Sequence, residues 1–265
     1  MSVPQPNFTV RVDPTNPGQF FACCGLLELA DRLLGGAEGW FDRRQFGIRA
    51  DGDLPGLIRA IAAIELSQVD PGDNTSSPIE MNLPRRPLRL DWWLDDRSGG
   101  KELKVWAGTM ESVRIALAMQ FAMRDDRFVS EALLDQGCIA YDPDDLKKKV
   151  EPYYFDVRRG PNAHSRDVGF SPNDLSMTTT AFPAVEFLAL VGLQRCRPAR
   201  TDQPRVFDYH TWAIPIPTSL IPPAVCGLLT HSGRRGYRFE NWYRTGQRKH
   251  KAFRAAVPIL EETDR

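Results

Sequence analysis

The chain has 265 residues, of which 42% are hydrophobic, and its 34 Lys/Arg balance its 34 Asp/Glu. This composition excludes a polycation and supports a hydrophobic core in one large domain or two small ones. The charges are unevenly placed, since the residues after Leu146 include 19 Lys/Arg and 11 Asp/Glu, whereas the preceding residues include 15 and 23. We therefore expect an acidic α+β half at residues 1–146 and a basic α+β half at residues 147–265, with one compact domain as the alternative.

The cysteines argue against a disulfide framework or a local metal site. They are Cys23, Cys24, Cys138, Cys196 and Cys226. An odd number without a CxxC pair or a signal peptide is typical of free thiols, and no local cluster supplies the ligands of a zinc ion. We expect neither a metal nor a cofactor. No apolar run reaches the ~18 residues of a membrane span, so we expect a cytoplasmic protein without a membrane partner.

A strand and a helix are predicted near the N-terminus. Phe8–Asp13 alternates like a strand. Asn16 suits an N-cap and Gln19 lies three residues further on, as in a capping box, so a helix is expected over Pro17–Leu34. Its apolar residues recur on one stripe, which predicts an amphipathic helix ended by Gly35.

Six further elements are expected in the acidic half. They are strands at Gln45–Ala50, Leu88–Leu94 and Leu103–Trp106, and helices at Leu54–Leu66, Thr109–Met123 and Arg127–Asp135. Because side chains alternate along a strand, Trp92 and Trp93 are expected on opposite faces. Asp70–Pro78 and Asp95–Lys101 are rich in turn-forming residues and predict loops.

The basic half predicts two strands and one apolar helix. Pro152–Val157 is a predicted strand, and Phe182–Leu193 is so apolar that a helix there must be buried on most faces. Val206–Ile214 predicts a strand, and the prolines of Pro215–Pro223 exclude a central position in a sheet. Strands and helices alternate without a regular period, so the fold class is α+β, a mixed sheet with packed helices.

The C-terminal stretch His231–Arg254 is the richest in function-related residues. Against Glu240 alone it holds Arg234, Arg235, Arg238, Arg244, Arg248, Lys249, Lys251 and Arg254, interleaved with Tyr237, Phe239, Trp242 and Tyr243. Cations neutralise phosphates and flat rings stack on exposed bases, so this pattern predicts a nucleic-acid surface. The alternative is a solvated basic helix whose aromatic side chains face the core.

A second basic segment, Arg158–Arg166, forms a loop after a predicted strand, where functional residues often lie. The turn Gly233–Gly236 allows close backbone approach to an anion, or simply closes a hairpin. The predicted nucleic-acid-binding residues are Arg158, Arg159, Arg166, Arg234, Arg235, Arg238, Arg244, Arg248, Lys249, Lys251, Tyr237, Trp242 and Tyr243.

The histidines allow an enzymatic alternative. Metal-independent RNA cleavage needs a general base for the 2′-hydroxyl and a proton donor for the leaving oxygen. His164 or His231, each beside arginines, would supply the base, with a tyrosine as its partner. Because no spacing defines such a geometry, and no GxSxG, Walker or HxxxH motif occurs, we expect no catalytic residue.

Three segments together resemble one protein family. They are Val12–Leu34 (VDPTNPGQFFACCGLLELADRLL), Gly169–Pro198 and Phe207–Pro217. They are similar to a small subunit family of the effector complex (Cascade) in type I-U, later I-G, CRISPR-Cas systems. The resemblance implies a ribonucleoprotein role in antiviral defence, with other effector subunits, guide RNA and target DNA as partners and no small-molecule substrate. It is also compatible with an RRM-like or ferredoxin-like (RAMP-like) core with insertions, whose glycine-rich loop loosely matches Gly233–Gly236.

These observations leave three hypotheses. The first is a non-catalytic subunit whose basic half contacts guide RNA or target DNA and whose acidic half docks neighbouring subunits. The second is a metal-independent endoribonuclease that processes guide RNA. The third is a purely structural bridge, in which the charges serve solubility and assembly.

Overall fold

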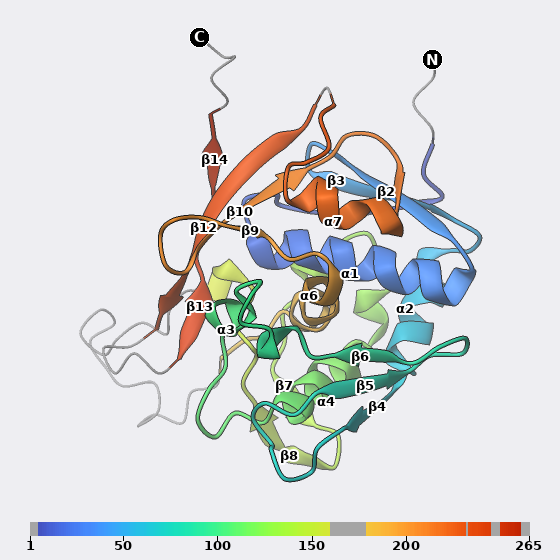
Figure 1. Ribbon diagram of the computed structural model, residues 1–265. Coiled ribbons are helices and arrows are strands. Elements are labelled where there is room, and N and C mark those ends of the chain that lie inside the picture. The colour runs from blue at the N-terminus through green and yellow to red at the C-terminus, as the bar shows by residue number, and fades with distance from the viewer. Residues whose placement is uncertain (1–4, 160–178, 232, 245–249, 261–265) are drawn as a thin grey trace.

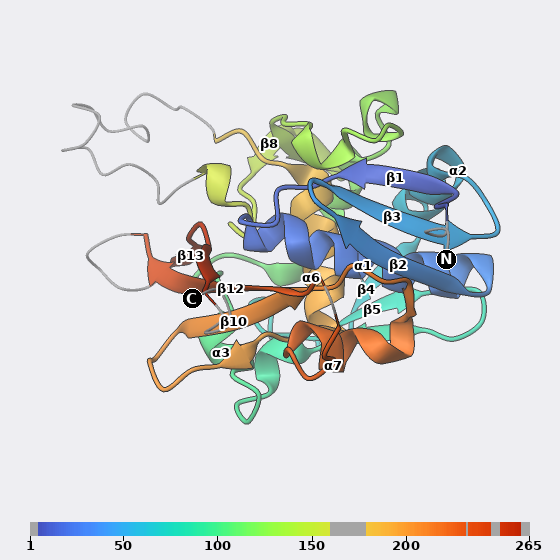
Figure 2. The same ribbon diagram turned by 90° about the horizontal axis from the view of Figure 1, so that it is seen from above.

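The computed structural model describes residues 5–159, 179–231, 233–244 and 250–260. Two helices, α1 (Pro17–Leu34) and α6 (Pro183–Arg195), cross at the centre of the molecule with the sheets around them (Figures 1 and 2). Their backbones approach closely because Gly25 of α1 faces Gly192 of α6. A Cβ on Gly25 would overlap the carbonyl oxygen of Leu188, so the crossing requires glycine.

Local signals set the ends of α1, and its predicted bounds are confirmed. The Asn16 side chain accepts a hydrogen bond from the Gln19 amide at 3.4 Å. The Gln19 side chain accepts from the Asp13 amide at 2.6 Å instead of closing a capping box. Gly35 ends the helix in the left-handed region, at φ 84°. The amphipathic prediction is wrong, since all residues from 17 to 30 are buried beneath α6 and two sheets.

The first sheet joins strands from both halves of the chain in the order β1-β3-β2-β11. These strands are β1 (Phe8–Arg11), β3 (Gln45–Ala50), β2 (Ala37–Asp42) and β11 (Ile216–Pro217). The proline-rich β11 takes an edge, as expected for a residue without an amide donor. β1, α1, β2 and β3 follow the strand–helix–strand–strand order with which a ferredoxin-like unit begins. The RRM-like assignment itself stays a prediction.

The second sheet is built from the C-terminal part of the chain, in the order β13-β12-β10-β9 with β14 also paired to β12. These strands are β13 (Lys251–Phe253), β12 (Arg235–Tyr243), β10 (Val206–Thr211), β9 (Ala199–Arg200) and β14 (Val257–Ile259). β12 is the long strand at the left of Figure 1. The described residues of the basic C-terminal stretch therefore form β12 and β13. The helix of the alternative prediction is wrong, although Tyr237 and Phe239 do face the core as that alternative expected.

The remaining elements surround this centre. They are α2 (Leu54–Ala62), α3 (Gly100–Leu103), α4 (Ser112–Ala122), α7 (Ile221–Val225), the sheet of β4 (Glu65–Gln68), β5 (Ile79–Asn82) and β6 (Leu88–Leu90), and the hairpin of β7 (Ala140–Asp142) and β8 (Asp145–Val150). Single 3-10 turns occupy Trp92–Leu94, Asp126–Phe128, Leu133–Asp135, Val157–Arg159 and Thr218–Leu220. Two of these turns replace the helix predicted at Arg127–Asp135.

The predicted strand Leu88–Leu94 ends early, and Trp92 and Trp93 do not face opposite environments. Both are buried in a 3-10 turn, and each indole has a backbone acceptor. Trp92 donates to the Leu190 carbonyl at 3.0 Å, and Trp93 to the Ser76 carbonyl at 2.7 Å. These two hydrogen bonds satisfy the indoles inside the core. The strand predicted at Leu103–Trp106 is likewise wrong, because Leu103 is the last residue of α3 and the residues from 104 to 106 form no strand.

The strand predicted at Pro152–Val157 is also absent from the described residues. Its amides bind a buried carboxylate instead: Glu186 of α6 accepts hydrogen bonds from Tyr154 (2.9 Å), Phe155 (3.2 Å) and Asp156 (3.1 Å). Tyr154 adopts a left-handed backbone, with φ 80°. The three charge-assisted bonds favour this turn over a sheet ladder, because they satisfy both the amides and the carboxylate.

The α+β class is confirmed, and one hydrophobic cluster extends across residue 146. It includes α1 from the acidic half and α6 from the basic half, together with Phe41, Tyr209 and Trp212. Tyr209 lies with its ring centre 4.3 Å from that of Phe20. The acidic and basic halves therefore share one hydrophobic core, although their net charges differ.

Candidate nucleic-acid interface

Strand β12 presents one tryptophan to solvent. Because side chains alternate along a strand, Tyr237 and Phe239 point into the core whereas Arg238 and Trp242 point outward. Trp242 is 41% exposed, and the other five tryptophans of the chain are buried. A large ring held by the backbone of a sheet and open to solvent is a platform on which a nucleobase can stack.

Two arginines flank the Trp242 ring. The guanidinium carbon of Arg205 lies 5.4 Å from the ring centre, and that of Arg254 lies 5.0 Å away. Arg205 also lies 4.9 Å from the half-buried ring of Tyr243. Such cation–π contacts hold the guanidinium groups over the ring. Neither arginine is among the predicted binding residues: Arg254 was visible in the basic stretch, whereas no local pattern marks Arg205. We call Arg205, Trp242, Tyr243 and Arg254 the Trp242 cluster.

Arg205 differs from the other arginine of this cluster in its charge environment. Within the described part of the chain, no carboxylate side chain forms an ion pair with it. Its Nε is buried and has no hydrogen-bond partner there. Its backbone is left-handed, at φ 62°, and its amide donates to the Glu102 side chain at 3.1 Å. Arg254, by contrast, is paired with Glu240 at 3.1 Å. The cluster therefore keeps a positive charge beside an exposed ring.

The outward-facing Arg238 is already engaged within the sheet. Its Nε and Nη2 donate to the two carboxylate oxygens of Asp208, both at 2.7 Å. Asp208 lies directly opposite on β10, so the strand register creates this pair. A two-bond pair of this kind largely neutralises the guanidinium, and Arg238 is a weaker phosphate ligand than its exposure implies.

Lys251 lies opposite Tyr243 in the β12–β13 register and is half-buried. Its ammonium group donates to the backbone carbonyls of Lys101 (3.0 Å) and Glu102 (2.9 Å). Burial, followed by the charge of nearby Arg205, lowers the pKa of Lys251 from 10.5 to about 8. Lys251 therefore anchors β13 to the start of α3 and adds to the positive potential near the Trp242 cluster.

The turn that precedes the Arg158–Arg166 segment contacts the ends of β12 and β13. The amide of Phe253 in β13 donates to the carbonyl of Tyr154 at 3.2 Å. The guanidinium carbon of Arg244 lies 3.6 Å from the centre of the Tyr154 ring. Tyr154 precedes Arg158 by four residues, and residues 160–166 of that segment lie outside the described part of the chain.

Arg158 itself is held by acids of the chain. It is paired with Asp156 at 2.6 Å and with Asp135 at 3.0 Å, and it lies 3.6 Å from the centre of the Phe182 ring. Its side chain links the turn after Tyr154 to the segment before β7. These contacts give Arg158 a structural role that the sequence did not indicate.

At the start of β12 the predicted residues differ in their surroundings. Tyr237 is 5% exposed and its ring stacks on Tyr209, with centres 5.5 Å apart, so it offers no free face to a base. Arg234 donates to the Gly227 carbonyl at 2.7 Å, and the side chain of Arg235 is exposed. Gly233 lies in a turn at φ 86°.

Several predicted residues lie outside the described part of the chain. They are Arg166, Arg248 and Lys249, together with the side chain of Arg159. The ribonuclease alternative also stays a prediction. Of its two candidate bases, His164 lies outside the described residues, and His231 is described and half-buried.

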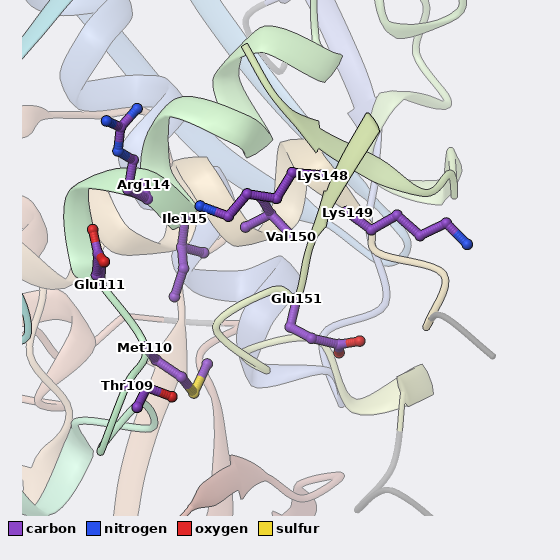
Figure 3. A pocket seen from close by; sticks show the side chains of 9 residues that line it. All are labelled: Thr109, Met110, Glu111, Arg114, Ile115, Lys148, Lys149, Val150 and Glu151. Atoms are coloured by element: carbon purple, nitrogen blue, oxygen red, sulfur yellow. The ribbon is translucent and has the colours of Figure 1, made fainter. Parts of the chain in front are cut away.

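A cavity of about 180 Å³ lies between the start of α4 and β8. Figure 3 shows Ile115 and Val150 at its centre, with Lys148 reaching toward the Arg114 side and Lys149 pointing away. Arg114 and Lys148 both pair with Asp142, at 3.5 Å and 3.3 Å. Because Arg114 and Lys148 are neutralised and Lys149 points away, this cavity is a poor candidate for a phosphate.

The described residues contain neither a cluster of metal ligands nor a membrane-spanning helix. No group of three or more His, Cys, Asp or Glu there is arranged to hold a metal ion, and the five cysteines are free. Burial raises the pKa of Cys23 and Cys24 well above the usual value. None of the described helices is long and apolar enough to cross a membrane.

Comparison of the chain with protein-family models, with curated proteins and with solved structures found no match.

Proposed function

We propose that this protein is a non-catalytic nucleic-acid-binding subunit of an RNA-guided type I CRISPR surveillance complex. The observation that carries the nucleic-acid part is Trp242, exposed on a sheet between Arg205 and Arg254. The assignment to a CRISPR complex rests on the resemblance of Val12–Leu34, Gly169–Pro198 and Phe207–Pro217 to a small effector subunit family.

The Trp242 cluster suits an unpaired base better than a duplex. A base that stacks on a tryptophan must expose its face, which it does in single strands, loops and ends. Stacking is worth about 1–3 kcal/mol per base and tolerates any sequence, because every base has a flat face. The uncompensated Arg205 would meet the neighbouring phosphate, and Lys251 would raise the local potential. The bound strand would be guide RNA or displaced target DNA.

The test is a fluorescence titration of labelled single-stranded RNA, single-stranded DNA and duplex DNA across a salt series, with and without partner subunits. Trp242→Ala should weaken single-strand binding about tenfold or more, whereas Trp242→Phe should stay within about threefold because a ring remains. Arg205→Gln should lower the salt slope by about one. Arg89→Gln is the matched control, because Arg89 is paired with Asp91 at 3.0 Å.

Two outcomes would refute this proposal. One is no binding of any of the three nucleic acids at low salt, even in the assembled complex. The other is binding that is as tight in Trp242→Ala as in the wild type, which would move the ligand away from the Trp242 cluster.

A further inference from the structure

A second cavity, of about 180 Å³, lies at the opposite end of β12. The turn between β2 and β3, the end of β10 and the start of β12 surround it. Its polar lining is formed by Asp42, Arg43, Thr211, Gly233, Arg235 and Tyr237. Arg235 and Trp242 are seven residues apart on an extended strand, about 23 Å at 3.3 Å per residue, so this cavity is separate from the Trp242 cluster.

The two arginines of this cavity are exposed and uncompensated. Over the described residues, neither Arg43 nor Arg235 forms an ion pair, although Arg49 on the same hairpin pairs with Glu38. The one carboxylate in the lining is Asp42. Two guanidinium groups from segments about 190 positions apart in the chain therefore face one cavity with an excess of positive charge.

Two hydroxyl groups line the same cavity. The Tyr237 ring is held by stacking on Tyr209, which leaves its hydroxyl as the group that it offers. Burial raises the pKa of Tyr237, and the nearby Asp13 charge adds to this rise. The charge of Arg235 and a hydrogen bond from it oppose the rise, and the hydroxyl keeps its own proton for donation. Thr211 lies opposite Arg235 in the β10–β12 register, and its hydroxyl already donates to the Arg235 carbonyl at 3.4 Å.

The backbone of Gly233 also permits close approach from one side. It is left-handed at φ 86°, and a Cβ there would lie 2.9 Å from that of Ala213. A larger residue would have a strained backbone and would crowd Ala213, so glycine leaves this side of the cavity open.

We propose that this cavity binds a phosphate group through the guanidinium groups of Arg43 and Arg235 and the hydroxyl group of Tyr237. Guanidinium donors match the oxygens of a phosphate in pairs, and a hydroxyl completes the ring of donors. The phosphate comes either from the end of a polynucleotide or from a small phosphate ester. The proposal does not depend on the Trp242 cluster.

The test is isothermal titration calorimetry of the full chain with inorganic phosphate at constant ionic strength. The wild type should show saturable binding at one site, and Arg43→Gln and Arg235→Gln should each weaken it about tenfold, the loss expected for one charged hydrogen bond. Tyr237→Phe should weaken it about threefold or more. Asp42→Asn should strengthen it, because the only carboxylate of the lining is removed.

Arg44→Gln is the matched control, since Arg44 is the next residue of the same turn, is exposed and does not line the cavity. It should change phosphate affinity by less than about twofold, as judged against the tenfold loss expected for one bond. Equal affinities of Arg43→Gln, Arg235→Gln and Arg44→Gln would overturn the proposal, as would the absence of saturable phosphate binding by the wild type. Equal melting temperatures of the variants exclude misfolding as the cause.

The source of the phosphate group is identified by measuring the binding of two oligonucleotides of the same sequence. One carries a 5′-phosphate and the other a 5′-hydroxyl. Tighter binding of the phosphorylated strand, abolished in Arg43→Gln, assigns the cavity to a polynucleotide end. Equal binding of both, with inorganic phosphate binding retained, assigns it to a small phosphate ester. Trp242→Ala should leave inorganic phosphate binding unchanged, so failure of this site and failure of the Trp242 cluster give different results.

Discussion

Lys251 shows how burial changes the chemistry of a single side chain. Its ammonium group is partly removed from water, two backbone carbonyls and the charge of Glu102 compensate it incompletely, and Arg205 lies nearby. The charged form is therefore disfavoured and the pKa falls to about 8. A shift from 10.5 corresponds to about 3 kcal/mol of differential stabilisation between the two protonation states.

This shift predicts a pH dependence of stability. Between about pH 8 and 10.5 the unfolded chain binds more protons at Lys251 than the folded chain, so this group raises the free energy of unfolding as the pH increases. Below pH 8 its full cost is present. Urea unfolding at pH 7, 8, 9 and 10 should therefore show the wild type gaining stability relative to Lys251→Met by about 2–3 kcal/mol. Two parallel pH profiles would contradict this.

Among the elements, the crossing of α1 and α6 depends most on residue size. Gly25 and Gly192 place the two backbones in contact, and a Cβ on Gly192 would overlap the carbonyl oxygen of Phe21. Neither helix could move away without opening the core on both sides, because the first sheet and the second sheet pack on α1.

Gly25→Ala and Gly192→Ala are therefore each expected to lower the free energy of unfolding by about 1–3 kcal/mol, or more, despite the better helix propensity of alanine. Chemical denaturation with circular dichroism measures this. Gly56→Ala is the control: Gly56 is exposed in α2 and a Cβ there would meet only the Asp53 side chain at 3.0 Å and beyond. It should stay within about 1 kcal/mol of the wild type. Equal effects of the three changes would contradict the role assigned to the crossing.

For the whole molecule, charge and core divide the chain differently. The acidic and basic halves are separate in composition, yet β11 pairs with β2 and α6 packs on α1 across the boundary at residue 146. Residues of α1 such as Phe20 and Leu27 are completely buried in the shared core. Each half alone would expose this surface to water.

Separate fragments 1–146 and 147–265 should therefore fail to fold independently. Each is expected to lack a sigmoidal urea transition and a near-ultraviolet circular dichroism signal. Coexpression of the two should restore both, since the core is completed by association. A cooperative transition in fragment 1–146 alone would instead show that the acidic half is an independent domain.

The sequence determined the features that depend on a few neighbouring residues. Asn16 and Gly35 set the ends of α1, the apolar run after Phe182 predicted a buried helix, and the α+β class followed from element order. Local signals act over one helical turn or one strand pleat, so they can be read directly. The same periodicity could not show how many sides of α1 are covered, because coverage depends on α6 and the sheets.

Only the tertiary structure decided which charges are free. Trp242 was predicted from its basic surroundings, but its partner Arg205 lies 37 positions earlier and is brought beside it by the pairing of β10 with β12. The same register pairs Arg238 with Asp208, which weakens a predicted phosphate ligand, and packing places Arg43 and Arg235 around one cavity. A charge is available to a ligand only when no acid lies opposite it, and strand register between distant segments decides this.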